Sequence, residues 1–269
     1  MKKFKFGALG ADPEVFLKDK DGKPYSAEGL FGGTKLAPVP MGIGDGFFIQ
    51  EDNVAAEYNI PPCSNARDFA NSILRGLSYI NKVAKRNNLQ LALEAALNFD
   101  PTQLATPHAQ MLGCEPDYNI WTLSINPRPV PPATLRTAAG HLHASWQTPD
   151  EDQKVALVRA LDITLGVPSI LVTKMNERRS LYGRAGAFRD KPYGVEYRTL
   201  DNFWLGSRKY AIHVFNQVIE TMDQINTEGA MFLDELEDRS EEIQATINNH
   251  DKDNAIKLMN YFQVQPFPA

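Results

Sequence analysis

Extended segments in which polar and apolar residues alternate restrict the fold of this chain more than any other feature. Strand signals cover residues 4–10, 14–18 and 47–60, with turns and glycine-rich stretches between them. Helical periodicity becomes prominent only after residue 62. Strands and helices therefore come in blocks rather than in strict alternation. This order predicts an α+β fold, an antiparallel β-sheet with flanking helices, instead of a doubly wound parallel sheet.

The middle of the chain carries one clear helix and one long alternating segment. Apolar residues spaced by three or four, from Phe69 to Ala84, predict a helix capped by Ser64. Residues 89–99 then alternate with a period of two, which predicts a single half-buried strand. The proline-rich stretch 100–137 predicts irregular structure, and long segments of this kind are more often functional loops than spacers.

Further helices are predicted toward the C-terminus. Thr148 as the cap and Pro149 at the first helical position start one helix, which Gly166 and Pro168 end. The remaining predicted helices cover residues 207–226, 234–242 and 253–262.

Charge and composition exclude several classes of protein. The chain has 28 Lys and Arg against 33 Asp and Glu, so its net charge of −5 argues against a broad surface for nucleic acid or membrane. Cys63 and Cys114 match no zinc-site spacing, and we expect no disulfide framework. The N-terminus lacks the apolar core of a signal peptide, and no apolar run approaches the roughly 18 residues of a membrane span. A cytoplasmic protein is expected.

Four extended segments place chemically active side chains on one face. These side chains are Asp12 with Glu14, Glu57 with Asn53 and Asn59, His141 with His143, and Glu196 with Arg198. If the four strands are neighbours in one sheet, they form a single polar floor, and its oxygen ligands suit Mg²⁺ or Mn²⁺ better than zinc. Each segment alone is most often a solvated strand face, but the presence of all four in one chain favours a site.

Positive charge concentrates in one stretch of this acidic chain. Residues 174–198 carry Lys174, Arg178, Arg179, Arg184, Arg189, Lys191 and Arg198. Arginine forks bind phosphate or carboxylate, and Gly183 and Gly186 would let backbone amides approach an anion. A solvated helix end followed by a loop is the alternative. Nucleic acid is disfavoured because regularly interleaved aromatic residues are missing.

The glycine-rich loop at residues 29–35 matches neither of the common nucleotide-binding fingerprints. It has no GxxxxGK[ST] pattern, and the chain has no GxGxxG pattern. Any nucleotide is therefore bound outside the P-loop and Rossmann architectures.

Seven ordered blocks make the chain resemble a known enzyme family. The blocks are residues 10–14, 32–35, 52–62, 113–121, 136–143, 178–186 and 191–198. Over residues 7–206 the sequence resembles the phage-type COOH–NH2 ligases, which are type 2 amidoligases of the glutamine synthetase and glutamate–cysteine ligase superfamily. We expect a single amidoligase-like catalytic domain over residues 1–269, in which residues 207–269 form a C-terminal helical extension.

The resemblance implies a glutamine synthetase-like sheet that binds ATP and divalent metal, and an amide-forming reaction through an acyl phosphate. It implies metal ligation by Asp12, Glu14, Glu57 and Glu196. It implies nucleotide or substrate binding by Lys35, His141, His143, Arg178, Arg179 and Arg189. It implies catalytic roles for Glu57, Arg184 and Arg198.

Two other functions remain open at this point. One is a metal-dependent hydrolase of amide or amidine bonds that uses the same floor, and the other is a non-catalytic phage accessory protein that binds a partner. For the ligase we expect small-molecule or peptide carboxylate and amine substrates, no direct binding of nucleic acid or membrane, and, for a phage-encoded protein, the host cytoplasm.

Overall fold

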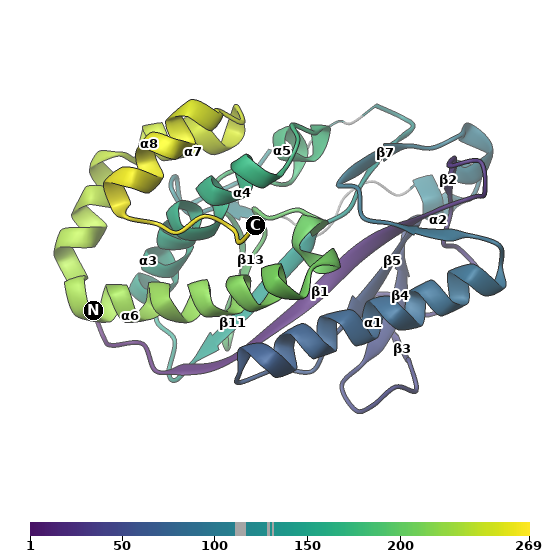
Figure 1. Cartoon of the computed structure of the whole chain (residues 1–269), viewed down its shortest axis with the longest axis horizontal. Helices are drawn as coiled ribbons and strands as arrows, with labels where there is room; N and C mark the ends of the chain where they lie inside the picture. The colour runs from purple at the N-terminus through teal and green to yellow at the C-terminus, as the bar shows by residue number, and fades with distance from the viewer. Residues whose placement is uncertain (111–116, 128–129, 131) are drawn as a thin grey trace.

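A long first strand organises the sheet at the centre of the molecule. In the computed structural model, which describes residues 1–110, 117–127, 130 and 132–269, β1 (Phe6–Lys18) pairs with β5 (Ala55–Asn59) on one side and β11 (Gly140–Trp146) on the other. The order across the sheet is β3 (Val39–Pro40), β4 (Phe48–Asp52), β5, β1, β11, β13 (Gly194–Tyr197), β12 (Ala187–Lys191), β8 (Tyr118–Asn119) and β9 (Ser124–Ile125). Figure 1 shows β1 and β11 running side by side through the molecule.

Smaller strands extend this arrangement at one end of β1. The strands β2 (Pro24–Tyr25) and β6 (Gln90–Ala92) pair with the end of β1, and β7 (Ala96–Asn98) pairs with β10 (Leu135–Thr137) in a separate two-stranded sheet. Every strand pair among the described residues is antiparallel. The predicted α+β class with an antiparallel sheet is confirmed.

Helices cover one face of the sheet. In Figure 1, α1 (Ala66–Arg86) and α6 (Arg208–Asp238) cross in front of it, and both pack against β1 and against each other. The other helical elements are the 3₁₀ turn Pro101–Leu104, α2 (Pro107–Gln110), α3 (Glu151–Leu161), α4 (Val167–Val172), α5 (Glu177–Leu181), the 3₁₀ turn Asn202–Gly206, α7 (Ser240–Asn248) and α8 (Lys252–Phe262).

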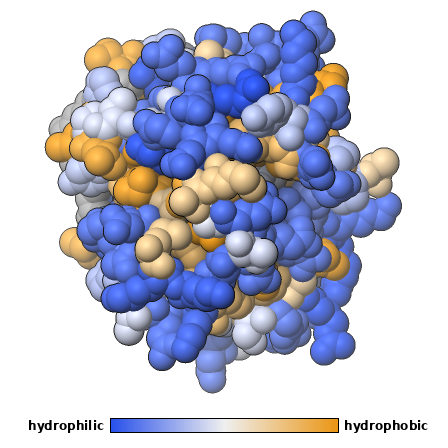
Figure 2. Space-filling view, turned by 90° about the vertical axis from the view of Figure 1, so that its left-hand side faces the viewer, coloured by the Kyte–Doolittle hydropathy of each residue, from blue (hydrophilic) through white to orange (hydrophobic). Residues whose placement is uncertain are grey.

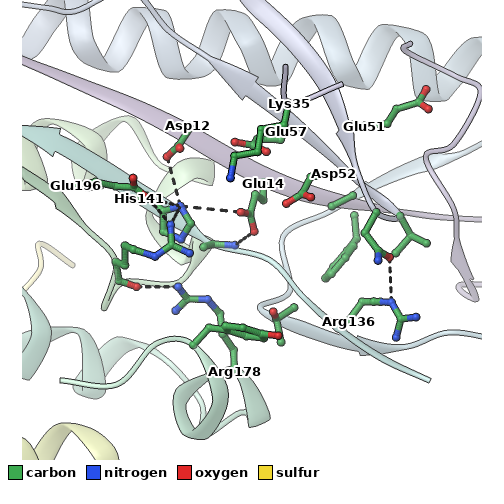
Figure 3. A pocket seen from close by; sticks show the side chains of 18 of the residues that line it. Asp12, Glu14, Lys35, Glu51, Asp52, Glu57, Arg136, His141, Arg178 and Glu196 are labelled. Carbon is green, nitrogen blue, oxygen red and sulfur yellow. Dashed lines mark hydrogen bonds and ion pairs between the residues drawn. The ribbon is translucent and has the colours of Figure 1, made fainter. Parts of the chain in front are cut away.

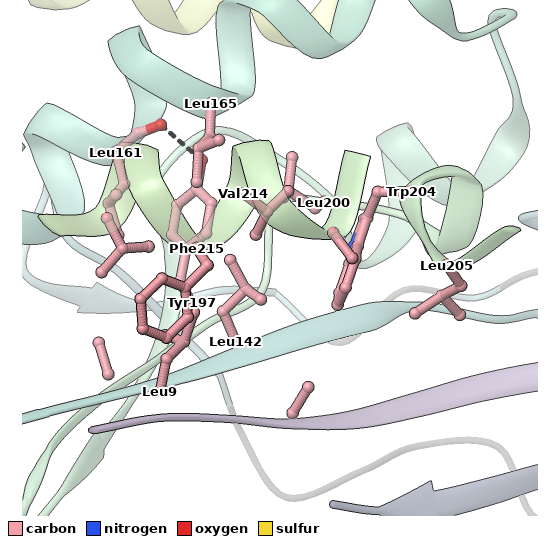
Figure 4. Close-up of a cluster of buried hydrophobic side chains, with 14 of the residues drawn as sticks. Leu9, Leu142, Leu161, Leu165, Tyr197, Leu200, Trp204, Leu205, Val214 and Phe215 are labelled. Atoms are coloured by element: carbon pink, nitrogen blue, oxygen red, sulfur yellow. Dashed lines mark hydrogen bonds between the residues drawn. The ribbon is translucent and has the colours of Figure 1, made fainter. Parts of the chain in front are cut away.

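The alternation of each central strand separates the core from the opposite face. On β11, Leu142 and Ala144 join the hydrophobic core, while His141 and His143 point the other way. Figure 4 shows Leu9, Leu142 and Tyr197 of three neighbouring strands beneath the helix that carries Val214 and Phe215. The helices thus seal one face of the sheet and leave the polar residues on the other face.

Two predicted strands are divided in the structure. Residues 47–60 form the hairpin β4–β5, in which Asn53 has a positive φ of 61° and turns the chain. Residues 89–99 form β6 and β7, which belong to different sheets because β6 pairs with β1 and β7 pairs with β10. A two-residue period is the same in one strand as in two, so it could not reveal either break.

The helix predicted from Thr148 to Gly166 has different ends. Its cap is Asp150, whose side chain accepts from the Gln153 amide at 2.9 Å in a capping box. Beyond α3 the chain stays helical through a π-helical turn, Asp162–Gly166, into α4. Pro168 lies just after this π-helical turn and does not end the helical path.

Other predicted helix bounds shift by smaller amounts. Asn65 instead of Ser64 caps α1, because its side chain accepts from the Asp68 amide at 2.9 Å. The helix predicted over 207–226 continues to Asp238 and bends at Gly229, which has non-helical dihedral angles. The predicted segments 234–242 and 253–262 correspond to the end of α6, to α7 and to α8.

One helical stretch of the described chain has the length and apolar composition of a membrane span. It runs over Glu151–Val172, and 78% of its most apolar window is buried inside the protein. Since α3 packs against α6 and β13, this stretch lies in the core of the domain.

Candidate active site

The predicted polar floor forms on the face of the sheet that the helices leave open. The strand register pairs Asp12 with His141, Glu14 with Glu57, and His143 with Glu196. Arg189 on β12 lies opposite Glu196 as well. Four central strands therefore bring together residues that are up to 184 positions apart, from Asp12 to Glu196, as the alternating segments predicted.

A cavity of about 520 Å³ lies over this floor. Its acidic and imidazole lining consists of Asp12, Glu14, Glu51, Asp52, Glu57, His108, His141 and Glu196, and its cationic lining consists of Lys35, Arg136, Arg178, Arg189, Lys191 and Arg198. Figure 3 shows the carboxylates of Asp12, Glu14, Asp52 and Glu57 gathered above His141 and Arg178. Groups of both signs thus converge on one cavity.

The first group of possible metal ligands, named here the Asp12 cluster, consists of Asp12, His143 and Glu196. One ligand atom from each lies within 4.8 Å of the others. The Nε2 atom of His143 is 3.1 Å from Asp12 Oδ2, and Nδ1 of His141 is 3.4 Å from Asp12 Oδ1. Glu196 forms ion pairs with Arg198, with Lys191 at 2.9 Å and with Arg189 at 3.3 Å.

These neighbours keep the Asp12 cluster ionised. Burial raises the pKa of Asp12, but His143 and His141 outweigh it and hold that pKa well below its usual range. Burial and Asp12 raise the pKa of Glu196, yet Arg198 and the two histidines lower it to about 2. Burial, together with Arg198, lowers the pKa of His141 to about 4, so His141 is neutral at physiological pH.

The second group, named here the Glu14 cluster, consists of Glu14, Asp52 and Glu57, again with ligand atoms within 4.8 Å of one another. Glu14 Oε2 accepts from the Ala139 amide at 2.9 Å, and Glu57 Oε2 accepts from Gln50 Nε2 at 2.7 Å. Burial and then repulsion from Asp52 raise the pKa of Glu14 to about 8, although Arg198 and Arg178 act in the opposite direction. Burial also raises the pKa of Asp52, and burial with Asp12 raises that of Glu57.

Both clusters have the chemistry of a divalent cation site. Three carboxylates in the Glu14 cluster offer the oxygen ligands that Mg²⁺ and Mn²⁺ prefer, and the Asp12 cluster adds one imidazole, which Mn²⁺ accepts readily. Raised pKa values are expected when carboxylates that would share a cation lie close together in its absence, and the Glu14 cluster shows this direction.

The predicted arginines divide into two groups. Arg178, Arg189 and Arg198 line the cavity, and Arg178 Nη2 donates to the carbonyl of Arg198 at 2.8 Å. A Cβ at Gly183 would lie 2.3 Å from Arg178 Nη1, so the glycine leaves space for this guanidinium. Arg178 is therefore fixed in the wall beside the Glu14 cluster.

Arg179 and Arg184 lie outside the cavity lining. Arg179 is buried and donates to the carbonyls of Gly183 at 3.2 Å and Thr199 at 3.0 Å. Arg184 is exposed, and its Nε donates to the Ser180 carbonyl at 3.0 Å. The binding role expected for Arg179 and the catalytic role expected for Arg184 therefore stay predictions, and neither side chain is among the cavity-lining residues.

Several residues of the site were not predicted from the sequence. Asp52 was missed because the β4–β5 hairpin, which the two-residue period could not show, turns its side chain onto the floor. Arg136 was missed because it precedes the HxH strand. Its Nε donates to Asn53 Oδ1 at 2.9 Å and its Nη2 to the Ala109 carbonyl at 2.7 Å. The signal for Arg136 was its place in the resemblance block 136–143.

The predicted Lys35 lies on the cavity wall, at the tip of a tight turn.

His143 contacts Tyr193 as well as Asp12, with 2.6 Å between its Nδ1 and the Tyr193 hydroxyl. Cys63 is a free, buried cysteine. The predictions that involve Gly113, Cys114, Pro129 and Pro131 lie outside the described residues.

A comparison with known protein families finds one family model that is similar to part of this chain. Residues 132–255 match the family model described as "Phage phiEco32-like COOH.NH2 ligase-type 2". Within this range the match agrees with the resemblance indicated by the sequence blocks. No curated protein matches the chain.

Solved structures similar to this chain include the following three. A bifunctional glutathione synthetase from Pasteurella multocida has a TM-score of 0.45 and 14% identity, over 96% of this chain and 49% of that one. GmaS without ligand has a TM-score of 0.44 and 13% identity, over 96% and 70%. A GmaS/ADP complex has a TM-score of 0.41 and 13% identity, over 95% and 68%. This chain spans about half the length of the first of these.

Proposed function

We propose, from the family match over residues 132–255 and the paired acidic clusters, that this protein is an ATP- and Mg²⁺-dependent ligase that joins a carboxylate to an amine. The observation that carries the proposal is that the carboxylates of both clusters line one cavity, whose wall also carries Arg178, Arg189 and Arg198. Phosphoryl transfer needs positioned charge more than it needs a protein nucleophile. A cavity lined by carboxylates and arginines supplies such charge.

The Asp12 and Glu14 clusters are the proposed ligands of divalent cations, Mg²⁺ or Mn²⁺. When bound, such cations would neutralise the triphosphate and the charge that develops on the transferred phosphoryl group. Neutral His141 stands between the clusters, with its Nδ1 3.7 Å from Glu196 Oε1 and 4.0 Å from Glu14 Oε1. Its proposed role is to orient these carboxylates or to donate to a phosphate oxygen.

In the proposed reaction a substrate carboxylate oxygen attacks the γ-phosphorus of ATP. A new P–O bond forms, the bond to the β-phosphate oxygen breaks, and ADP leaves the acyl phosphate behind. The amine nitrogen then attacks the acyl carbon and loses a proton. The C–O bond to phosphate breaks, so that the products are the amide, ADP and inorganic phosphate.

The arginines of the cavity wall are the proposed partners of the transferred group. Arg178 Nη2 donates a hydrogen bond to the backbone carbonyl of Arg198, so the positions of the two residues are coupled. Bidentate guanidinium groups suit the equatorial oxygens of a phosphoryl group and the acyl phosphate. Lys35 approaches the same cavity from the opposite wall.

The chain is proposed to act as one catalytic domain. Helices α6 and α8, from the C-terminal segment, pack against α1 and α4, so they support the same sheet. Small-molecule or peptide carboxylates and amines are the proposed substrates, and the cytoplasm, of the host in the case of a phage-encoded protein, is the proposed location.

The test is a screen of carboxylate and amine pairs for release of ADP and phosphate. We expect equal amounts of both products, only when Mg²⁺, a carboxylate and an amine are all present, and none from the Glu57→Gln variant. Release of an amine without ATP would instead identify a metal-dependent hydrolase. Failure to bind nucleotide, with no turnover in a broad screen, would favour a non-catalytic binding protein.

A further inference from the structure

One carboxylate that lines the cavity is engaged in a way that the proposed reaction does not explain. Glu51, on β4, accepts three backbone amides of the glycine-rich loop: Phe31 at 2.9 Å and Gly32 at 2.7 Å on Oε1, and Gly29 at 3.0 Å on Oε2. Figure 3 shows Glu51 apart from the carboxylates of the floor. Because both of its oxygens are occupied by amides, Glu51 is organised to hold the loop.

The same loop is fixed to β4 by its backbone. Gly33 has a positive φ of 78°, and a Cβ there would lie 2.7 Å from the carbonyl oxygen of Ile49. Thr34 and Ala37 then exchange two backbone hydrogen bonds, of 3.1 and 3.0 Å, which close a two-residue turn. Lys35 and Leu36 form the tip of this turn, and both line the cavity.

The tip of this turn places the Lys35 ammonium near the Glu14 cluster. Figure 3 shows the Lys35 side chain extending toward Glu57 and Glu14. Its charge also acts on Asp52, where it opposes the effect of burial. The contacts run from Glu51 through the amides of residues 29–32 to the turn at residues 34–37 and to the Lys35 ammonium.

We propose that Glu51 is a positioning residue, whose carboxylate holds the glycine-rich loop against β4 and thereby fixes Lys35 over the Glu14 cluster. That the fixed ammonium meets a nucleotide phosphate rests on the proposed function. Glu51 belongs to neither group of possible metal ligands. Without this anchor the glycine-rich loop would be conformationally free, and Lys35 would sample many positions. Nucleotide binding would then be weaker, because it would have to order the loop and lose that conformational entropy.

The first test measures backbone hydrogen exchange in the free protein. In Glu51→Gln the exchange of the amides of Gly29, Phe31 and Gly32 should speed up by about tenfold or more, because one charged acceptor oxygen is lost. Asp19→Asn is the matched control, since Asp19 accepts the amides of Asp21 and Lys23, each at 2.9 Å, in an exposed turn. Unchanged exchange in Glu51→Gln would overturn the proposal.

The second test is a double-mutant cycle on the Kd for ADP with Mg²⁺, measured by calorimetry. Glu51→Gln and Lys35→Met should each weaken binding by about tenfold, and the double variant should be no weaker than Lys35→Met alone. Losses that multiply, or a loss in Glu51→Gln with none in Lys35→Met, would overturn the proposal. A wild-type protein that binds no ADP, while the loop opens only in Glu51→Gln, would refute the ligase function and still support the anchor.

Discussion

The two acidic clusters of the floor lie on neighbouring strands but are stabilised in opposite ways. In the Asp12 cluster, histidines face Asp12, and Arg198, Arg189 and Lys191 face Glu196, which lowers the pKa values of both carboxylates. In the Glu14 cluster, burial and mutual repulsion dominate, and the pKa values of all three carboxylates are raised. The protein neutralises the first cluster itself and leaves the second in need of a cation.

The difference between the two clusters indicates which of them is suited to bind a cation. Carboxylates that are brought together without compensation reduce the stability of the fold, and a cation bound only by the native state restores it. The Glu14 cluster therefore has the properties of a site prepared for a divalent metal. The Asp12 cluster is already organised by protein charges, so a metal there would have to compete with them.

The largest effect is expected when the Glu14 cluster is broken. Glu57→Gln should reduce ligase activity by at least about 10³-fold, because a proposed metal ligand is lost. The free energy of unfolding of the metal-free protein should stay the same or rise, since one repelling carboxylate is removed. Activity and chemical unfolding in EDTA measure the two quantities. A marked loss of stability would show that Glu57 has a structural role instead.

The same change in the Asp12 cluster should have the opposite effect on stability. Glu196→Gln leaves Arg198 and Arg189 buried without their anionic partner, and breaking buried ion pairs in this way costs about 3–5 kcal/mol. Chemical unfolding of the metal-free variant, compared with Glu57→Gln, gives the difference directly. Equal stabilities of the two variants would contradict the contrast between the clusters.

A smaller effect is expected from the wall beside the Glu14 cluster. Arg178→Lys keeps the charge but loses the fork, and should lower kcat/KM by about 10²-fold. Arg184→Lys is the matched control, because Arg184 is exposed and lies outside the cavity. It should change kcat/KM by less than about twofold. A larger loss in Arg184→Lys than in Arg178→Lys would restore the catalytic role expected for Arg184 from the sequence.

The smallest expected effect is a pH dependence of stability in the absence of metal. The pKa of Glu14 is raised from 4.5 to about 8, so its contribution to stability is complete below 4.5 and is lost as the pH rises through about 8. Glu196, with a pKa lowered to about 2, behaves in the opposite way and loses its contribution only in acid. Between pH 4.5 and about pH 8 the free energy of unfolding should fall by at most about 1.4 kcal/mol per pH unit, and it should level off above about pH 8.

Thermal unfolding in EDTA from about pH 5 to about pH 8 checks this dependence. The loss should disappear in Glu14→Gln, and it should shrink when Mg²⁺ is added, because a bound cation favours the ionised carboxylates. If the dependence of stability on pH is the same in Glu14→Gln as in the wild-type protein, the titrating group is not Glu14.

Much of the floor could be predicted from the sequence because a strand repeats every two residues. Asp12 with Glu14, His141 with His143, and Glu196 each follow this period, so their common face was fixed once the strands were assigned. That four such strands are neighbours was an assumption, and the strand order confirms it. The resemblance blocks supported the same residues independently.

The remainder depended on where the chain turns. The turn at Asn53 decides that Asp52 faces the floor, and alternation alone does not show it. Arg179 lies in the short helix α5, which is only five residues long, and Arg184 lies in the loop after it, so no sustained period shows the direction of either side chain. The role of Glu51 depends on amides presented by glycines at residues 29 and 32, whose positive φ values are a property of the folded loop.

Whether the floor binds metal and nucleotide is tested most directly by a crystal structure with Mn²⁺ and a non-hydrolysable ATP analogue. Anomalous scattering would locate the Mn²⁺ ions. We expect Mn²⁺ at the Glu14 cluster first and at the Asp12 cluster when nucleotide is present, with the triphosphate between the clusters and Arg178 and Arg198. Mn²⁺ and nucleotide bound elsewhere, with both clusters empty at saturating concentrations, would contradict the proposal that this floor is the ligase site.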